Sequence, residues 1–536
     1  MVRTFTPDWL ADQPQALAML PRGYTQPAAR AHAVATAAKR QVHPGVLAAI
    51  ARTSQTLPPR PARDAALAQL SQAGTVAVVT GQQLGLFLGP LYTLYKAVSA
   101  IVNARQLTAE TGVAAVAVFW LQNEDHDAAE IDHTYAPGAG EARRFSVQLP
   151  GTGRESISEL ELPAETDSVL ALLHQHLQGL PDAEVVHAWL SRSWQSHRDL
   201  TEAFTSSLDA LLGDSGLLFL DPRAPELAEA AGDFHKRCLD FAEPLAMVLQ
   251  ERATALAEQG WDVPVHIRPA APLFFYAPDG EQGPRFRLQA QGDAYALVGD
   301  AAQRTIQAHA LRQALDVHPR AFSTSVLSRP LWQDTLLPCV AYVGGPGEIA
   351  YFSQLAPAYA LLGLPMPLLV PRSRWLITDA PTQTALQQAG VSLADLAAGP
   401  ARWTASLAGL AGSQQQTMDA LQARLTEPFV HELSLLEGEM AAADPGLTKA
   451  VKQTQAAVAE SVARLLGKWQ RVLASQQSAE LAKRMRWRTI LTPDGAPQER
   501  VHGLPWFAAR YGLQHVVASV LEQTVPFSGE IKELFL

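Results

Sequence analysis

The sequence predicts an α/β protein with an open parallel sheet at its centre, followed by a long helical hairpin. Three short apolar segments, at residues 75–80, 113–121 and 337–344, predict the sheet, because buried parallel strands read as continuous apolar runs. Each segment runs into a glycine-rich or strongly polar loop. We expect the ligand to bind where these loops converge, since open α/β sheets place ligands outside the carboxyl ends of their strands.

Length and charge narrow the class of protein. The chain has 536 residues, of which 48% are hydrophobic, and a net charge of −10, which predicts a large core and argues against a broad nucleic-acid surface. The start, MVRTFTPDWLADQP, lacks the apolar stretch of a secretory signal, and no run reaches the ~20 apolar residues of a membrane span. We expect a cytoplasmic protein that handles small molecules and binds neither nucleic acid nor membrane. Cys238 and Cys339 are far apart and lack metal-type spacing, which argues against a disulfide framework and a zinc finger.

Changes in residue pattern along the chain indicate its domains. Residues 1–74 read as helical, and residues 261–299 alternate apolar and polar residues between turn signals, as a small antiparallel sheet does. After residue 379, Ala-, Leu- and Gln-rich stretches with few strand formers predict helices. We predict a core at 1–378 with insertions at about 135–215 and 261–320, a coiled-coil domain at 379–490, and a tail at 491–536 that packs back on the core.

The helical part reads as an antiparallel hairpin. Apolar residues recur there at spacings of three and four, at Met418, Leu421, Leu425, Phe429, Leu433, Leu436 and Met440 and again at Val458, Val462, Leu465, Trp469 and Val472. The break ADPG at 443–446 separates the two arms, and a hairpin of this kind predicts a homodimer. The run KRMRWR at 483–488 places cations at the end of the second arm, where they complement the helix dipole; a phosphate site is the alternative.

The first loop, TGQQLGLFLGP, has the composition of an anion-binding turn. Gly81, Gly85 and Gly89 allow close backbone approach, and Pro90 suits the start of a helix whose free N–H groups would face an anion. A plain strand-to-helix turn is the alternative, because the pattern matches neither the Walker nor the dinucleotide fingerprint.

Polar side chains in and after this loop favour ligand binding. The adjacent amides of Gln82 and Gln83 would be poor core residues at the tip of a strand but good donors to a polar ligand. Tyr92 and Lys96 share one face of the following helix, so a cation could be held over the pocket; a solvent-facing lysine is the alternative.

The second loop, NEDHD, concentrates ionisable groups. Glu124, Asp125 and Asp127 surround His126 and repel one another, so a metal, a cationic substrate or arginines must compensate. A carboxylate beside an imidazole can bind an ammonium group or take its proton, which makes these four residues the catalytic candidates. A purely structural acidic turn is the alternative.

Two rival functions follow from the same features. Glu130 and His133, expected three apart on a following helix, would extend the cluster into a metal site, and a metal-dependent hydrolase would use Asp125, His126, Asp127 and His133. We assign no metal ligand. The long hairpin also suits a non-catalytic sensor of a small metabolite.

The third loop lies in SVLSRPLWQDTLLPCVAYVGGPGE. Three polar residues, Arg329, Gln333 and Asp334, precede its strand, and three glycines, Gly344, Gly345 and Gly347, follow it. Glu348 would either cap the next helix or face a ligand on the glycine loop. Arg372 and Arg374, after the strand LPMPLLVP, are candidate clamps for a substrate carboxylate; ordinary surface arginines are the alternative.

Five blocks together resemble the bacillithiol biosynthesis cysteine-adding enzymes, the BshC family. They occur in family order as TGQQLGLFLGPLYTLYKAVSAI, VFWLQNEDHDAAEIDH, RPLWQDTLLPCVAYVGGPGEIAYFSQL, MPLLVPRS and PQERVHGLPWFAARYG. The resemblance implies a Rossmann-like core with two connecting insertions, as in class I nucleotidyltransferases and synthetases, and a coiled coil that forms a homodimer. It also implies a ligase that joins L-cysteine to the amine of glucosaminyl-malate in the last step of bacillithiol synthesis.

Roles for the residues follow from that reaction. The group Asp125, His126 and Asp127 would bind and deprotonate the amine. The Gly81–Gln83 turn and the Gly344–Gly347 loop would hold anionic groups, and Arg329, Arg372 or Arg374 would hold malate.

The sequence departs from the family and its distant relatives at two points. Asn123 stands where the family usually has a small residue, and would add an amide at the pocket. The synthetase motifs HxGH and KMSKS are missing, so activation by ATP does not follow. The family is associated with an adenine nucleotide at the junction of core and coiled coil, for which Arg500 and Tyr511 are candidates; no other cofactor is expected.

Overall fold

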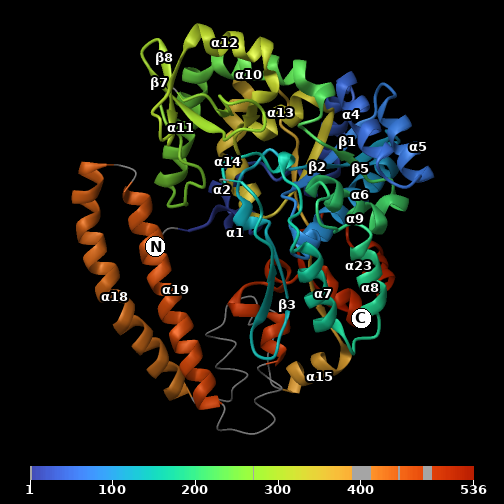
Figure 1. Ribbon diagram of the computed structural model, residues 1–536, viewed down its shortest axis with the longest axis vertical. Coiled ribbons are helices and arrows are strands. Elements are labelled where there is room, and N and C mark those ends of the chain that lie inside the picture. The colour runs from blue at the N-terminus through green and yellow to red at the C-terminus, as the bar shows by residue number, and fades with distance from the viewer. Residues whose placement is uncertain (1–2, 152, 270, 389–411, 445–446, 475–485) are drawn as a thin grey trace.

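The computed structural model describes residues 3–151, 153–269, 271–388, 412–444, 447–474 and 486–536. A parallel sheet of five strands lies at its centre, in the order β12-β11-β1-β2-β5 (Figure 1). The strands are β1 (Val76–Gln82), β2 (Ala115–Leu121), β5 (Leu218–Leu220), β11 (Cys339–Gly344) and β12 (Leu368–Pro371). All four pairings are parallel, which confirms the predicted α/β class.

The order of the strands creates a switch point. From β1 the chain builds β2 and β5 on one side, and then returns to add β11 and β12 on the other. Helix α6 (Tyr92–Thr111), which follows β1, packs on β1, β2 and β11. The loops after β1 and β11 therefore leave the sheet side by side, which is where such sheets place a ligand crevice.

Short helices cover the amino-terminal part of the core. They are α1 (Phe5–Leu10), α2 (Pro14–Met19), α3 (Pro27–Ala37), α4 (Pro44–Gln55) and α5 (Pro61–Leu70). All but α1 begin at a proline, which suits the first helical position because its missing N–H has no partner there in any case.

The segment between β2 and β5 begins with a hairpin and continues with helices. Its elements are β3 (His133–Pro137), β4 (Ala142–Ser146), α7 (Thr166–Leu177), α8 (Ala183–Ser191) and α9 (Leu200–Leu212). The expectation of a helix carrying both Glu130 and His133 is wrong, because Glu130 ends a single 3₁₀ turn, Ala128–Glu130, and His133 begins β3.

A second, antiparallel sheet lies between β5 and β11, in the order β10-β6-β7-β8-β9. Its strands are β6 (Phe274–Tyr276), β7 (Phe286–Gln291), β8 (Ala294–Val298), β9 (Thr305–Gln307) and β10 (Phe322–Thr324). The alternating pattern predicted antiparallel strands here. The helices of this region are α10 (Ala228–Asp240), α11 (Ala242–Glu258), α12 (Ala308–Val317) and α13 (Ser328–Leu336), and α14 (Pro346–Leu361) connects β11 to β12.

The C-terminal part contains the predicted helical hairpin, seen as two long orange helices beside the core (Figure 1). Helices α18 (Gly412–Ala443) and α19 (Leu447–Ala474) pack against each other. Residues 483–485 of the basic run lie outside the described residues. No helix among those described is long and apolar enough to cross a membrane.

The chain then returns to the core. After α15 (Ala380–Gln388) and the hairpin come α21 (Gln498–Val501), α22 (Leu504–Tyr511), α23 (Leu513–Gln523) and β14 (Ile531–Phe535). Strand β14 pairs in parallel with β13 (Arg374–Thr378). This pairing brings α21 close to the end of the central sheet, where it contributes to the site.

Candidate active site

A cavity of about 840 Å³ lies at the carboxyl ends of β1, β2 and β11, with the antiparallel sheet on its other side. Twelve of the candidate residues line it: Gln82, Gln83, Tyr92, Lys96, Glu124, Asp125, Arg329, Gly345, Gly347, Glu348, Arg372 and Arg500. Eight others do not: Gly81, His126, Asp127, Gln333, Asp334, Gly344, Arg374 and Tyr511. The three polar loops therefore meet at one cavity, as their positions after parallel strands predict.

Lys96 forms the floor of the cavity beside β1. Its Nζ donates to Gly81 O and to Gln82 Oε1, each at 2.8 Å, and forms an ion pair with Glu348. The side chain is buried, so the alternative of a solvent-facing lysine is wrong. Burial lowers the pKa of Lys96, and the Glu348 carboxylate opposes this change.

The position of Glu348 is compatible with both of the roles considered for it. It caps α14, because Gly345 N–H donates to Oε2 at 2.8 Å, and it also lines the cavity. Tyr342 O–H donates to Oε1 at 2.5 Å. Burial alone would raise the pKa of Glu348, but Lys96, Tyr342 and the Gly345 N–H together lower it, so this carboxyl stays ionised.

The start of α6 does not offer the anion site predicted for it. The helix begins at Tyr92 instead of Pro90, and the Leu91 N–H donates to His502 O at 2.8 Å. An isolated bridge between Pro90 and Gly503 brings the tail over this end of the helix. The tail therefore covers a helix terminus that the sequence pattern suggested was open.

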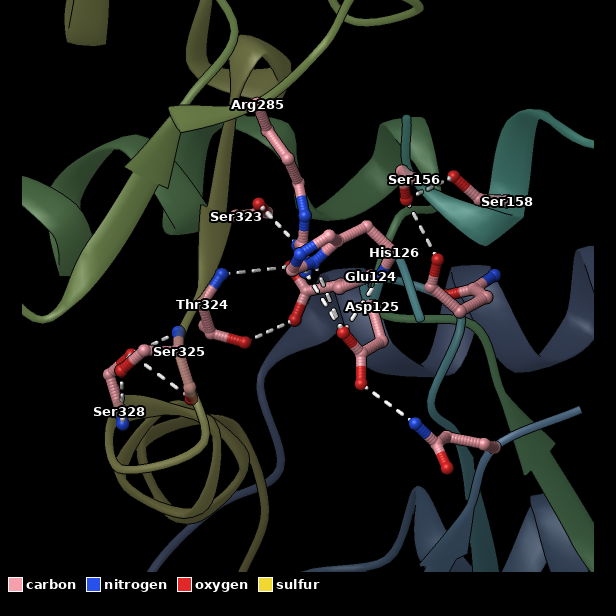
Figure 2. Close-up of polar contacts among 12 residues, drawn as sticks. Glu124, Asp125, His126, Ser156, Ser158, Arg285, Ser323, Thr324, Ser325 and Ser328 are labelled. Atoms are coloured by element: carbon pink, nitrogen blue, oxygen red, sulfur yellow. Dashed lines mark hydrogen bonds and ion pairs between the residues drawn. The ribbon is translucent and has the colours of Figure 1, made fainter. Parts of the chain in front are cut away.

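Arg285 provides the compensating charge for the acidic loop (Figure 2). Its guanidinium donates to Asp125 Oδ1 at 3.2 Å and to His126 Nδ1 at 2.9 Å. Because arginine only donates, His126 Nδ1 is the acceptor in this hydrogen bond. Gln83 Nε2 donates to Asp125 Oδ2 at 2.8 Å, which joins the first and second loops.

The two neighbouring carboxyls have opposite electrostatic environments. Glu124 is buried and accepts from Thr324 Oγ1 at 2.5 Å, and burial raises its pKa although Thr324 opposes the rise (Figure 2). Burial also acts on Asp125, but hydrogen bonds from the His126 backbone N–H and from Gln83, together with the charge of Arg285, outweigh it and lower its pKa. Adjacent carboxyls whose pKa values diverge in this way are suited to different roles, one as a proton acceptor and one as a fixed anion.

Asn123 does not add an amide to the cavity, contrary to the expectation from sequence. The residue is fully buried, and its Nδ2 donates to Asp221 Oδ1 at 2.8 Å. Its backbone oxygen accepts from Ser156 Oγ at 2.7 Å. Asn123 therefore connects the ends of β2 and β5 and supports the acidic loop from behind.

The candidate arginine clamps already have partners. Arg372 donates to both carboxylate oxygens of Glu499, at 2.8 and 2.9 Å, and Arg374 Nε donates to Oε1 at 3.0 Å. Arg372 is only 2% exposed, so the alternative of a surface arginine is wrong for it. Because Glu499, on α21 in the tail, pairs with both arginines, fewer cationic groups are free to bind a substrate.

Arg329, on α13, is buried and lines the cavity. It donates to Gln333 Oε1 at 3.0 Å and to Tyr351 O–H at 3.2 Å. Gln333 and Asp334 lie in the interior, where Gln333 Nε2 donates to Asp334 Oδ1 at 2.9 Å and Tyr359 O–H also donates to Asp334. The inward face of α13 therefore serves packing at these two positions.

The two nucleotide candidates do not share a cavity. Arg500 lines the main cavity and a smaller one of about 170 Å³ beside β3. Tyr511 lines neither, and its O–H donates to Asp379 Oδ2 at 3.2 Å. Residues 389–411 and 475–485, at the base of the hairpin, lie outside the described residues.

Sequence reasoning missed the contribution of the antiparallel sheet. Arg285 lies 160 positions from Asp125 in the chain, and Thr324 lies 200 from Glu124. The only signal was RFR at 285–287, where arginines alternate with an apolar residue at strand spacing. Within the described ranges, no group of three or more His, Cys, Asp or Glu side chains could hold a metal ion.

Two family models together match almost the whole chain. One, described as bacillithiol biosynthesis BshC, N-terminal Rossmann-like domain, matches residues 3–373. Another, the C-terminal coiled-coil domain of BshC, matches residues 375–536. The chain belongs to the BshC family. Its Rossmann-like core and C-terminal coiled coil are those that the resemblance implied.

Several BshC relatives align over most of their length. One from Heliobacterium modesticaldum is 33% identical over 476 residues, 85% of this chain and 82% of that protein. One from Koribacter versatilis is 31% identical over 492 residues, 89% of this chain and 88% of that protein. One from Geobacillus thermodenitrificans is 29% identical over 459 residues, 84% of this chain and 82% of that protein. All three bear the name "Putative cysteine ligase BshC", which supports a ligase and does not favour the hydrolase or sensor alternatives.

Proposed function

We propose that this protein joins the carboxyl group of L-cysteine to the amine of glucosaminyl-malate, the last step of bacillithiol synthesis. The observation that carries the proposal is the pair Glu124 and Asp125, adjacent carboxyls at one cavity with pKa values shifted in opposite directions. Membership of the BshC family of bacillithiol biosynthesis supports this choice of substrates.

The pair divides the work of activating an amine. An amino sugar carries an ammonium group at neutral pH, and this group must lose a proton before its nitrogen can attack. Asp125, held ionised by Arg285 and Gln83, attracts the ammonium. Glu124 takes the proton, because its raised pKa makes it the better base of the two. His126 holds Arg285 in place and does not line the cavity.

Bond formation places a second demand on the cavity. The amine lone pair forms the new C–N bond at the cysteine carboxyl carbon, which must carry a leaving group, and negative charge develops on the carboxyl oxygen. The glycine loop at Gly345 and Gly347 and the Lys96 ammonium lie on the side of the cavity opposite the antiparallel sheet. The Gly347 N–H, in the first turn of α14, is the donor proposed for that oxygen, and the charge of Lys96, whose N–H groups already have acceptors, would stabilise it at longer range.

The test is made on the thiols of a host cell. In a strain lacking the gene, we expect the cysteinyl-glucosaminyl-malate thiol to disappear and its cysteine-free precursor to accumulate, as measured by mass spectrometry. The wild-type gene restores the thiol, whereas Glu124→Gln does not. Glu460→Gln, which changes an exposed carboxyl on α19, is the matched control and restores it fully.

Two outcomes contradict the proposal in different ways. An unchanged thiol pool in the deletion strain removes the proposed reaction. Full restoration by Glu124→Gln removes the proposed base while leaving the reaction in place, and Asp125→Asn then tests the other carboxyl.

The hairpin suits a homodimer, as its pattern predicted. Large apolar side chains on it are exposed in the single chain, at 44% for Leu425, 42% for Phe429, 61% for Leu465 and 43% for Trp469. A second copy of the hairpin would cover this face by coiled-coil packing. Phe429→Glu with Trp469→Glu should convert the dimer to a monomer in light scattering after size-exclusion chromatography, and an unchanged mass contradicts this interface.

A further inference from the structure

Three arginines that line the cavity, Arg268, Arg287 and Arg500, have no side-chain acceptor among the described residues. Arg268, in the loop before the antiparallel sheet, and Arg287, on β7, both line the cavity. In the part of the chain that the structure describes, neither side chain has a hydrogen bond or an ion pair. Arg285, Arg329 and Arg372 in the same cavity all donate to protein acceptors. Two of the cationic groups available to a ligand, Arg268 and Arg287, therefore lie on the antiparallel-sheet side of the cavity and not at the clamps that the sequence suggested, and Arg500 lies on α21.

A third arginine adds to the positive charge. Arg154 stacks on the Phe286 ring, 5.2 Å from its centroid, and its backbone oxygen accepts from Arg285 N–H at 3.0 Å. Burial lowers the pKa of Arg287, and the charges of Arg268 and Arg154 lower it further. Like charges gathered at a cavity wall repel one another, and an anion relieves that repulsion.

The strand geometry relates these arginines to the acidic loop. Arg285 immediately precedes β7 and Arg287 is the second residue of that strand, so their Cα atoms are roughly 6.6 Å apart at ~3.3 Å per residue, and both side chains line the cavity. Arg285 contacts Asp125, the proposed site of the ammonium group. Arg287 therefore lies about one sugar-ring width along the same wall from that site.

We infer that Arg268 and Arg287 form a subsite for a multiply charged anion, with Arg154 reinforcing its positive potential. Guanidinium groups bind carboxylates and phosphates through paired, charge-assisted hydrogen bonds, and two of them match a dianion. The inference rests on the proposed function for its first source, the malyl dicarboxylate, which an amino sugar acceptor carries on the ring carbon next to its amine. A polyphosphate chain, from an agent that activates cysteine, has the same chemistry and is the second source.

Calorimetric titration of the full chain tests the subsite and separates the two sources. The probes are glucosaminyl-malate, methyl glucosaminide, which has the amine but no dicarboxylate, and inorganic triphosphate. For the Arg268→Ala, Arg287→Ala double variant, we expect affinity for glucosaminyl-malate to fall about 10- to 100-fold, the range for charge-assisted hydrogen bonds, with methyl glucosaminide unchanged. A fall for triphosphate alone assigns the subsite to a polyphosphate. Unchanged affinity for both anions overturns the inference.

Two further variants identify the cause of any loss. The Arg268→Lys, Arg287→Lys double variant keeps the charge but loses the paired geometry, so we expect an intermediate affinity. Arg464→Ala removes an exposed charge from α19 and should leave every affinity unchanged. Because binding is measured without turnover, the result does not depend on Glu124. Failure of the ligase reaction and failure of the anion subsite are therefore distinguishable.

Discussion

Replacing Glu499 by glutamine should destabilise the core and loosen the tail. This carboxylate accepts three hydrogen bonds, two from Arg372 and one from Arg374, at 2.8 to 3.0 Å. The side chains of Glu499 and Arg372 are 4% and 2% exposed, whereas that of Arg374 is 22% exposed. Glutamine keeps the volume and removes the charge, so the variant leaves a buried guanidinium without a counter-ion.

The expected loss follows from burial. Breaking a buried ion pair by neutralising one partner costs about 3–5 kcal/mol. Arg374 retains some hydration, so its share is small, and we expect a decrease of about 3 kcal/mol in the free energy of unfolding. Glu460→Gln, which breaks an exposed pair with Arg464, is the control and should change the free energy of unfolding by less than about 0.5 kcal/mol.

Urea unfolding followed by circular dichroism measures both variants. The pKa of Glu499 is lowered by Arg372 and Arg374, against the effect of burial. A carboxyl with a lowered folded pKa stabilises the protein above its unfolded pKa, and that stabilisation is lost as pH falls through the folded value. The difference between wild type and Glu499→Gln should therefore shrink on acidification. A loss below about 1 kcal/mol at neutral pH, or one that does not shrink, refutes the reasoning.

Two further changes test the cavity. Thr324→Val removes the hydroxyl that donates to Glu124, so the pKa of that carboxyl should rise further. The acid limb of the pH profile of kcat/KM should then move to higher pH. If the acid limb does not move, Glu124 does not govern it. Lys96→Met leaves Glu348 buried with its charge uncompensated and should lower the free energy of unfolding by about 3–5 kcal/mol in urea. The Lys96→Met, Glu348→Gln double variant should recover much of that loss, and no recovery contradicts the pairing.

Much of the fold could be predicted from the sequence because the signals for its strands and helices are local. The runs at 75–80, 113–121 and 337–344 became three adjacent parallel strands, since continuous apolar residues suit a strand covered on both faces. The repeat of apolar residues at spacings of three and four predicted the two helices of the hairpin, because residues at these spacings lie on one face of a helix. Convergence of the polar loops followed from topology, because the carboxyl ends of parallel strands share one edge.

The sequence by itself determined which loops carry polar chemistry, but only the tertiary structure decided the partner of each charge. Arg285 pairs with Asp125, 160 positions away in the chain, and Glu499 pairs with Arg372, 127 positions away. Local pattern specifies the direction and exposed face of an element, whereas an ion pair depends on the distance between elements that pack together only in the folded chain. Lys96 is an example. Its position on a helix could be predicted from the sequence, but its burial and its ion pair with Glu348 could not, because burial depends on the packed core and not on the neighbouring sequence.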